Sequence, residues 1–327
     1  MPDRERTVRV LALCTAWYAI SSTQNVINKK FLSAHSLPVT LSLVHMLSIA
    51  LYLPIVIGIL VVPASPVFSS MYYLRVLMPL SLGKLLASVT AHVSIWKVPV
   101  SYAHTVKALM PLFIVALTRC LLKEKHPLKI YLTLLPIVGG VVVATVTELS
   151  FDFAGMISAV CSTLFMALQT IYSKKVLEDT GIHQLRLLLI LTRLTLLSLI
   201  PAWVYTDSSK FFTTVWSNEG YANSPLLVVL AISGLLNFSQ NVIAFTMLST
   251  VSSLSYSIAS SMKRIVVICV SLLMLHNPVT PINMMGMTVA VTGVLVYNKV
   301  KSDLNQQRIE LPRYSSDKLI NGRLTAV

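Results

Sequence analysis

Two adjacent cations, Lys263 and Arg264, interrupt the apolar run SYSIASSMKRIVVICVSLLML of residues 255–275. The run is long enough to cross a bilayer as a helix, and a charged side chain at mid-membrane costs about 2.5–3.5 kcal/mol on insertion scales. Other apolar runs contain three more cations: Lys84, Lys107 and Arg193. Such costly side chains mark functional sites, and their usual partner is a carboxylate at the same depth.

None of the 12 acidic residues is placed to neutralise these cations. All of them fall in tails, loops or helix ends: Asp3, Glu5, Glu124, Glu148, Asp152, Glu178, Asp179, Asp207, Glu219, Asp303, Glu310 and Asp317. A mobile anion is therefore the natural partner. An adjacent Lys and Arg suit a phosphate group, because the guanidinium can bind two oxygens at once while the ammonium supplies a point charge.

Polar residues at helical spacing predict a wet cavity around the cations. Lys84, Ser88 and His92 recur every fourth residue and share one helix face, as do His104 and Lys107 on the next segment. Three further segments carry polar positions: Gln24, Asn25 and Asn28; Asn237, Gln240 and Asn241; Tyr256 and Ser260. The side chains expected to line the cavity and to tune selectivity are Lys84, Ser88, His92, His104 and Gln240.

Each of these residues also has a purely structural interpretation. Ser, Asn and Gln on membrane helices often form interhelical hydrogen bonds, and a lone histidine is more often hydrogen-bonded within the fold than a ligand contact. Arg193 and Lys84 could equally bond backbone carbonyls or extend toward the membrane surface.

The composition excludes a water-soluble domain. The 327 residues are 55% hydrophobic and 12% charged, with a mean hydropathy of +0.75. We predict an all-α integral membrane protein with ten transmembrane helices, near residues 8–28, 38–61, 74–96, 100–122, 128–147, 151–173, 184–205, 225–248, 251–275 and 279–298. The net charge of +14 fits membrane topology and an anionic substrate better than a nucleic-acid partner. No metal or redox cofactor is indicated, and the four cysteines read as packing residues.

The distribution of Lys and Arg predicts that both termini face the cytosol, because few cations fall on the opposite side. Residues 1–7 then form a cytosolic tail, 8–300 the transporter domain and 301–327 a disordered cytosolic tail, with 206–225 as a lumenal loop. The first apolar segment carries SSTQN where a cleavable signal would have small residues, so it is expected to stay as a membrane helix. Nothing before it resembles an organellar transit peptide.

A faint internal repeat relates residues 123–145 to residues 273–298. Each begins at a loop proline and continues into a glycine-containing helix that ends in GVVVA or GVLVY. Two halves, about 8–147 and 151–298, would hold five helices each. Because five is odd, the halves would have inverted topology, as in many transporters that bind substrate between their repeats.

Several sequence blocks resemble the triose-phosphate translocators and their nucleotide-sugar transporter relatives in the drug/metabolite transporter superfamily. These blocks are VSYAHTVKALMPLF, ATVTELSFDFAGMISA, IYSKK and SMKRIVVICVS. HVSIWKVPVSYAHTVKA, ATVTELSFD and NPVT look closer still to subfamily E of solute carrier family 35. The resemblance implies obligatory exchange, with a phosphate held by a Lys of the fourth helix and a Lys-Arg pair of the ninth. The matching residues are Lys107, Lys263 and Arg264.

The sequence departs from the family around this phosphate grip. A family His and a Thr/Ser in the third helix fall on Ser88 and Ala91, and a family Tyr in the eighth falls on Gln240. Triose phosphate itself is therefore in doubt as the solute. The expected function is antiport of a phosphorylated solute, a sugar phosphate or nucleotide sugar, against phosphate or a nucleotide. The relatives outside plastids imply the Golgi or a related endomembrane.

Two other classes of function stay open at this point. A membrane-embedded transferase would need acidic residues for a metal or a base, and only Glu148 and Asp152 are close to suitable. A scaffold or trafficking factor that no longer transports is the other alternative. Neither the identity of the solute nor the oligomeric state follows from the sequence.

Overall fold

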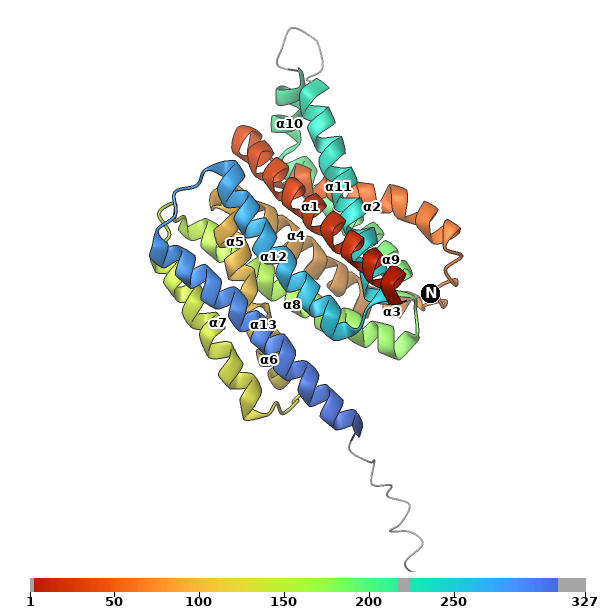
Figure 1. The fold of residues 1–327 in the computed structure, drawn as a ribbon. Helices are drawn as coiled ribbons and strands as arrows, with labels where there is room; N and C mark the ends of the chain where they lie inside the picture. Colours follow the sequence, from red (N-terminus) through yellow and green to blue (C-terminus); the bar gives the residue numbers. More distant parts are fainter. Residues whose placement is uncertain (1–2, 217–223, 311–327) are drawn as a thin grey trace, which may run out of the picture.

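The computed structural model describes residues 3–216 and 224–310, which form a bundle of long helices (Figure 1). This part of the chain contains no strand. Its elements, in chain order, are α1 (Asp3–His35), α2 (Pro38–Ile59), α3 (Ser70–Tyr72), the π-helical turn η1 (Tyr73–Leu77), α4 (Met78–Lys97), α5 (Val100–Val106), the 3₁₀ turn η2 (Lys107–Leu109), α6 (Met110–Leu121), α7 (Leu128–Val146), α8 (Phe153–Thr180), α9 (Gln184–Thr206), α10 (Ser208–Trp216), α11 (Ser224–Thr250), α12 (Ser253–Leu275) and α13 (Pro281–Glu310).

Eight helical segments of the described ranges are long and apolar enough to cross a membrane. They are residues 38–59, 70–97, 100–121, 128–146, 153–180, 184–206, 225–248 and 255–275, which match the second to ninth predicted segments. The prediction of an all-α, multi-pass membrane protein is confirmed. The first and last predicted segments are also helical and lie in α1 and α13. Their hydropathy is lower, because α1 contains the polar run 21–25 and α13 contains Asn283 and Asn298. The count of ten membrane helices stays a prediction.

Helical structure extends beyond the predicted membrane segments at both ends of the described chain. α1 begins at Asp3, within the predicted 1–7 tail, and α13 continues to Glu310, where a disordered tail was expected from residue 301. Both extensions consist of helix-compatible residues without Gly or Pro, so a helix held in the bundle propagates outward. The rest of the predicted tail, 311–327, lies outside the described residues.

The predicted loop 206–225 is in part a helix. Residues Ser208–Trp216 form α10, which lies at one end of the bundle (Figure 1). Phe211 of α10 packs against Trp203 of α9 with ring centroids 5.9 Å apart, and Val215 is buried. The apolar residues FF and V recur at helical spacing, which gives the segment a face to bury. Residues 217–223 of the predicted loop lie outside the described ranges.

A half-buried lysine joins α1 to the end of α4. The Lys29 ammonium of α1 donates hydrogen bonds to the carbonyls of Ile95, Trp96 and Val98, at 2.9, 3.1 and 3.1 Å. These carbonyls end α4, where the helix leaves its last acceptors unpaired and carries a partial negative charge. Lys29 therefore fastens α1 to the end of α4.

Opposite charges hold α9 against both ends of α2. Asp207 accepts hydrogen bonds from the Thr40 N–H and hydroxyl, at 2.9 and 3.1 Å, in the first turn of α2. At the other end, Arg186 donates to the carbonyls of Val62 and Pro63, just beyond α2. Each charge meets the helix end of opposite polarity, which favours α2 and α9 staying together as a pair.

Candidate anion-binding site

Pro111 shapes the site by breaking the helix that carries Lys107. A proline has no N–H, so the carbonyl four residues earlier, on Lys107, loses its α-helical donor. The chain instead forms the 3₁₀ turn η2, and the Met110 N–H bonds this carbonyl. Arg264 of α12 adds a second bond from its Nη1 to the Lys107 oxygen at 2.9 Å. The break thus brings Arg264 directly to Lys107.

An aromatic stack holds Lys263, the neighbour of Arg264 on α12. Its ammonium lies 4.4 Å from the ring centroid of Trp17 in α1, a cation–π contact. Trp17 is 1% exposed and stacks on Tyr256 with ring centroids 5.6 Å apart. The ring attracts the cation without neutralising it, so the positive charge remains available to an anion.

The three cations share one electrostatic environment without a carboxylate. Lys107, Lys263 and Arg264 are close enough for their charges to act on one another and on His104. The one ion pair in the described ranges joins Lys174 and Glu178, on the surface. The structure therefore brings together the three side chains predicted to bind phosphate. Arg264 contacts a carbonyl and a sulfur atom and Lys263 contacts an aromatic ring, but no carboxylate of the described residues pairs with them.

His104 borders this cluster with one ring nitrogen unused. Its Nε2 lies 3.1 Å from Oδ1 of Asn25, whose amide nitrogen donates to the Ser21 carbonyl. Since the Asn25 oxygen is an acceptor, Nε2 carries the proton, and the neutral ring presents Nδ1 as an acceptor. Nδ1 is buried and has no hydrogen-bond partner.

A second chain of hydrogen-bonded polar side chains runs between four helices. Ser42 bonds the Pro38 carbonyl and lies 2.6 Å from Nδ1 of His92, whose ring meets that of His45 edge-on at 4.9 Å. Nε2 of His45 lies 2.9 Å from the Ser233 hydroxyl, which itself donates to Asn28 at 2.6 Å. The chain links α4, α2, α11 and α1. It includes His92, one of the predicted cavity residues, as part of an interhelical network.

The other predicted residues lie in four different environments. Lys84 is buried and its ammonium donates to the Thr192 hydroxyl of α9 at 2.6 Å, while Ser88, one turn further along α4, is half-buried. Gln240 of α11 has a buried side-chain oxygen without a partner. Arg193 is exposed on α9. Thus His104 and Gln240 have unpaired atoms, whereas Lys84 faces the α4–α9 contact.

Sequence reasoning did not identify three residues of this polar chain, namely His45, Ser42 and Ser233. The sequence does show His45 and Ser42 as polar residues within the apolar run of α2. Isolated polar residues in membrane helices are common, however, and only their contacts distinguish a network from scattered side chains.

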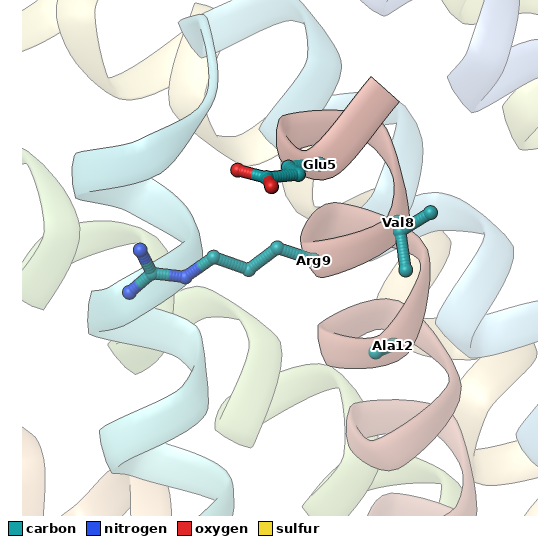
Figure 2. Close-up of a pocket in the computed structure, with 4 residues that line it drawn as sticks. All are labelled: Glu5, Val8, Arg9 and Ala12. Carbon is teal, nitrogen blue, oxygen red and sulfur yellow. The ribbon is translucent and has the colours of Figure 1, made fainter. Parts of the chain in front are cut away.

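An open groove of about 340 Å³ lies at the end of the bundle where the chain begins, lined by Glu5, Val8, Arg9 and Ala12 of α1. Figure 2 shows the Arg9 guanidinium reaching from α1 toward a neighbouring helix, with Glu5 beside it. None of the predicted site residues lines this groove.

The acids on which the enzyme alternative depends have local roles. Asp152 accepts a hydrogen bond from the Gly155 N–H at 2.7 Å and caps α8. Burial raises the pKa of the Glu148 carboxyl, although hydrogen bonds from Ser150 and Asn283 oppose that rise. In the described residues, no group of three or more His, Cys, Asp or Glu could hold a metal ion.

A family model, described as the Triose-phosphate Transporter family, matches residues 8–298. The chain belongs to this family. The match covers every element of the site, from Trp17 to Arg264, and so the predicted family is confirmed. The narrower resemblance to subfamily E of solute carrier family 35 stays a prediction.

The proteins to which this chain is similar include plastid translocators. The chain is 32% identical to phosphoenolpyruvate/phosphate translocator 3, chloroplastic, of Oryza sativa subsp. japonica, over 90% of this chain and 75% of the relative. It is 28% identical to glucose-6-phosphate/phosphate translocator 2, chloroplastic, of Arabidopsis thaliana, over 92% and 78%. A solved crystal structure, 15% identical, covers 93% of this chain and 99% of its own with a TM-score of 0.53, which shows a shared fold.

Proposed function

We propose that this protein is a secondary-active antiporter that exchanges a phosphorylated organic solute, a sugar phosphate or nucleotide sugar, for phosphate or a nucleotide. The observation that carries the proposal is the meeting of Lys107, Lys263 and Arg264 without a carboxylate in the described chain. A phosphate group supplies the missing negative charge, with Arg264 binding two of its oxygens and the lysines adding point charges. The names of the plastid relatives, all phosphate translocators, favour the same solute class.

The same charges account for obligatory exchange. Three unneutralised cations repel one another, and an empty site would have to carry them through a closed, dehydrated state. A bound phosphate neutralises most of this charge and so favours closure more than the open state. Solutes would therefore cross in both directions, whereas the empty carrier would move poorly.

Ten membrane helices in two inverted halves form the proposed machinery. The contacts between helices support this arrangement. In the proposed repeat, α1 corresponds to α8, α2 to α9, α4 to α11, α5–α6 to α12 and α7 to α13. When each helix is replaced by its counterpart, the principal pairs of contacting helices become other contacting pairs or remain the same pair. Three pairs are related in this way: α4–α8 to α11–α1, α4–α9 to α11–α2, and α6–α8 to α12–α1. The pairs α2–α9, α5–α12 and α7–α13 map onto themselves.

Counter-exchange in vesicles tests the proposed function. The purified protein is reconstituted into liposomes loaded with unlabelled phosphate, and uptake of radiolabelled phosphate, glucose 6-phosphate and nucleotide sugars is followed. We expect uptake that depends on the internal anion and stops in vesicles without it. Uptake independent of internal anion would contradict exchange. Absence of both uptake and anion binding would instead favour a scaffold.

Both termini are proposed to face the cytosol, with the protein in the Golgi or a neighbouring endomembrane. The orientation rests on the Lys/Arg asymmetry of the loops, and the compartment on the resemblance to carriers outside plastids. Tags at residues 1 and 327 should be digested by protease added to sealed, cytosol-side-out vesicles. A protected tag at either end would contradict the ten-helix topology, and a tagged protein found in plastids or mitochondria would overturn the proposed compartment.

A further inference from the structure

Six exposed lysines gather at the end of the bundle where α6 ends and α7 begins. They belong to the loop between these helices, the first turn of α7, the far part of α8 and the end of α13. The six, which we call the lysine patch, are Lys123, Lys125, Lys129, Lys174, Lys299 and Lys301. Membrane topology accounts for the positive sign of this end, but cations clustered from four elements also attract anions strongly.

The packing of α7 against α13 brings the lysines of separate elements together. The two helices lie side by side (Figure 1), and a Cβ at Gly293 of α13 would contact Ile137 of α7. The helices run antiparallel, so eight residues further along each of them Lys129 comes to the level of Lys301. Lys301 is also within electrostatic reach of Lys174 on α8. The lysines therefore form one patch rather than separate surface charges.

Hydrogen bonds to Thr118 of α6 hold the loop that carries Lys123 and Lys125. The Thr118 carbonyl accepts from the Glu124 N–H at 3.2 Å, and its hydroxyl lies 2.8 Å from Nε2 of His126. The loop is thus folded back onto the end of α6. Its two lysines are held beside the start of α7.

Exposed leucines alternate with these lysines. Leu121 is 49% exposed, Leu122 40% and Leu128 71%. Leu128 also begins the apolar segment 128–146, so the lysine patch lies at the boundary of a membrane span. Cations next to exposed apolar side chains at this depth match the two parts of a phospholipid, the charged headgroup and the first part of its acyl chains. A soluble acidic partner would meet the lysines but leave the leucines at the membrane boundary uncovered.

The chain itself supplies little negative charge to the lysine patch. Lys174 pairs with Glu178 at 3.5 Å, and Glu124 acts electrostatically on Lys301. Within the described ranges, the other lysines of the patch form no ion pair. Residues 311–327, which follow α13 in the sequence, contain three Lys or Arg and one Asp, so their net charge has the wrong sign to neutralise the patch.

We propose that the lysine patch binds the headgroups of anionic phospholipids, with the three leucines reaching the first part of the acyl chains. In the proposed orientation this end of the bundle faces the cytosol, and the cytoplasmic leaflet contains the anionic lipids that attract basic segments. The patch also joins α7 to α13, which close the two proposed halves. A bound headgroup therefore links the halves at the membrane surface.

Lipid titration of the purified full-length protein tests this proposal. Native mass spectrometry in detergent gives the affinity of the first bound lipid, with phosphatidylserine and phosphatidylcholine compared as probes. We expect phosphatidylserine to bind about tenfold more tightly than phosphatidylcholine. Replacing Lys123, Lys125 and Lys129 together by glutamine should reduce this preference to within about twofold. The melting temperature should not change, because the three side chains are exposed.

The control variant carries the same three charge removals at the other end of the bundle, Lys30→Gln, Lys97→Gln and Lys210→Gln, and should keep the preference. Glycerophosphoserine, the headgroup without acyl chains, should not displace the bound lipid. Equal affinities of the wild-type protein for the two lipids would overturn the proposal, as would an equal loss of preference in the control variant. Displacement by glycerophosphoserine would show a site for soluble anions instead of lipids. Because the measurement requires no transport, none of these results bears on the proposed antiport.

Discussion

Replacing Arg264 by glutamine is expected to abolish phosphate-dependent exchange without unfolding the empty protein. The guanidinium has no carboxylate partner in the described chain, so its removal relieves a desolvation cost. It does give up one hydrogen bond to the Lys107 carbonyl, but that oxygen keeps the Met110 N–H. With phosphate bound, the same change truncates a buried charge pair, which costs about 2–5 kcal/mol. The expected loss of affinity is therefore about 30-fold to several thousand-fold.

Lys263→Gln and Lys107→Gln should behave in the same way, because the three side chains are proposed to hold one phosphate. Arg264→Lys should recover little, since an ammonium cannot bind two oxygens as the guanidinium does. The measurements are counter-exchange in vesicles and the rise in melting temperature on adding phosphate. Arg193→Gln is the matched control, because it removes a cation from an exposed position on α9 and should preserve both. Unfolding of the three variants without ligand would make the cations structural, and exchange at the wild-type rate would remove them from the site.

The charge pattern of the sequence predicted an anion site, and the family resemblance singled out Lys107, Lys263 and Arg264 as the residues of that site. Lys107, Lys263 and Arg264 are costly in a membrane, and no acidic residue occurs at their depth, so an anion site follows from chemistry alone. How they meet could not be predicted. The contact between Arg264 and the Lys107 carbonyl needs the register of α5 and η2 against α12, two parts of the chain more than 140 residues apart, since this hydrogen bond spans 157 positions. Hydropathy along one helix contains no information about such a register.

Lys84 and His92 show the limit of reasoning from one helix face. With Ser88 they share a face of α4, as their spacing predicts, but their partners differ: Lys84 meets Thr192 of α9, and His92 meets Ser42 of α2. A face can border two neighbouring helices, and spacing does not say which positions meet a cavity between them. Their role as cavity residues stays a prediction. The helical extensions into the predicted tails were missed for a different reason. Hydropathy marks where a membrane segment ends, at the first charged residues, but a helix can continue through charged residues.

A methyl group added at Gly140 is expected to disrupt the fold, although the same change at the neighbouring Gly139 should not. α7 and α13 lie side by side (Figure 1), and a Cβ at Gly140 would lie 2.4 Å from the Ala290 nitrogen and 2.7 Å from the Gly286 oxygen. These are backbone atoms, which cannot move aside as a flexible side chain can. Gly140 and Ala144 face Gly286 and Ala290, so each helix presents two small residues one turn apart, a pattern that lets membrane helices approach closely.

Gly140→Ala should therefore push α7 and α13 apart and destabilise the protein by about 1–3 kcal/mol, the usual scale for overpacking. A Cβ at Gly139 meets nothing within 4 Å, and alanine favours a helix over glycine, so Gly139→Ala should melt at or above the wild-type temperature. Melting of the two purified variants in the same detergent, without ligand, gives the comparison. Because α7 closes one proposed half and α13 the other, the Gly140 variant should also lose exchange in proportion to its folded fraction. Equal melting temperatures for the two variants would show that the helices can separate freely at this point, and the close contact would then have no part in holding the halves together.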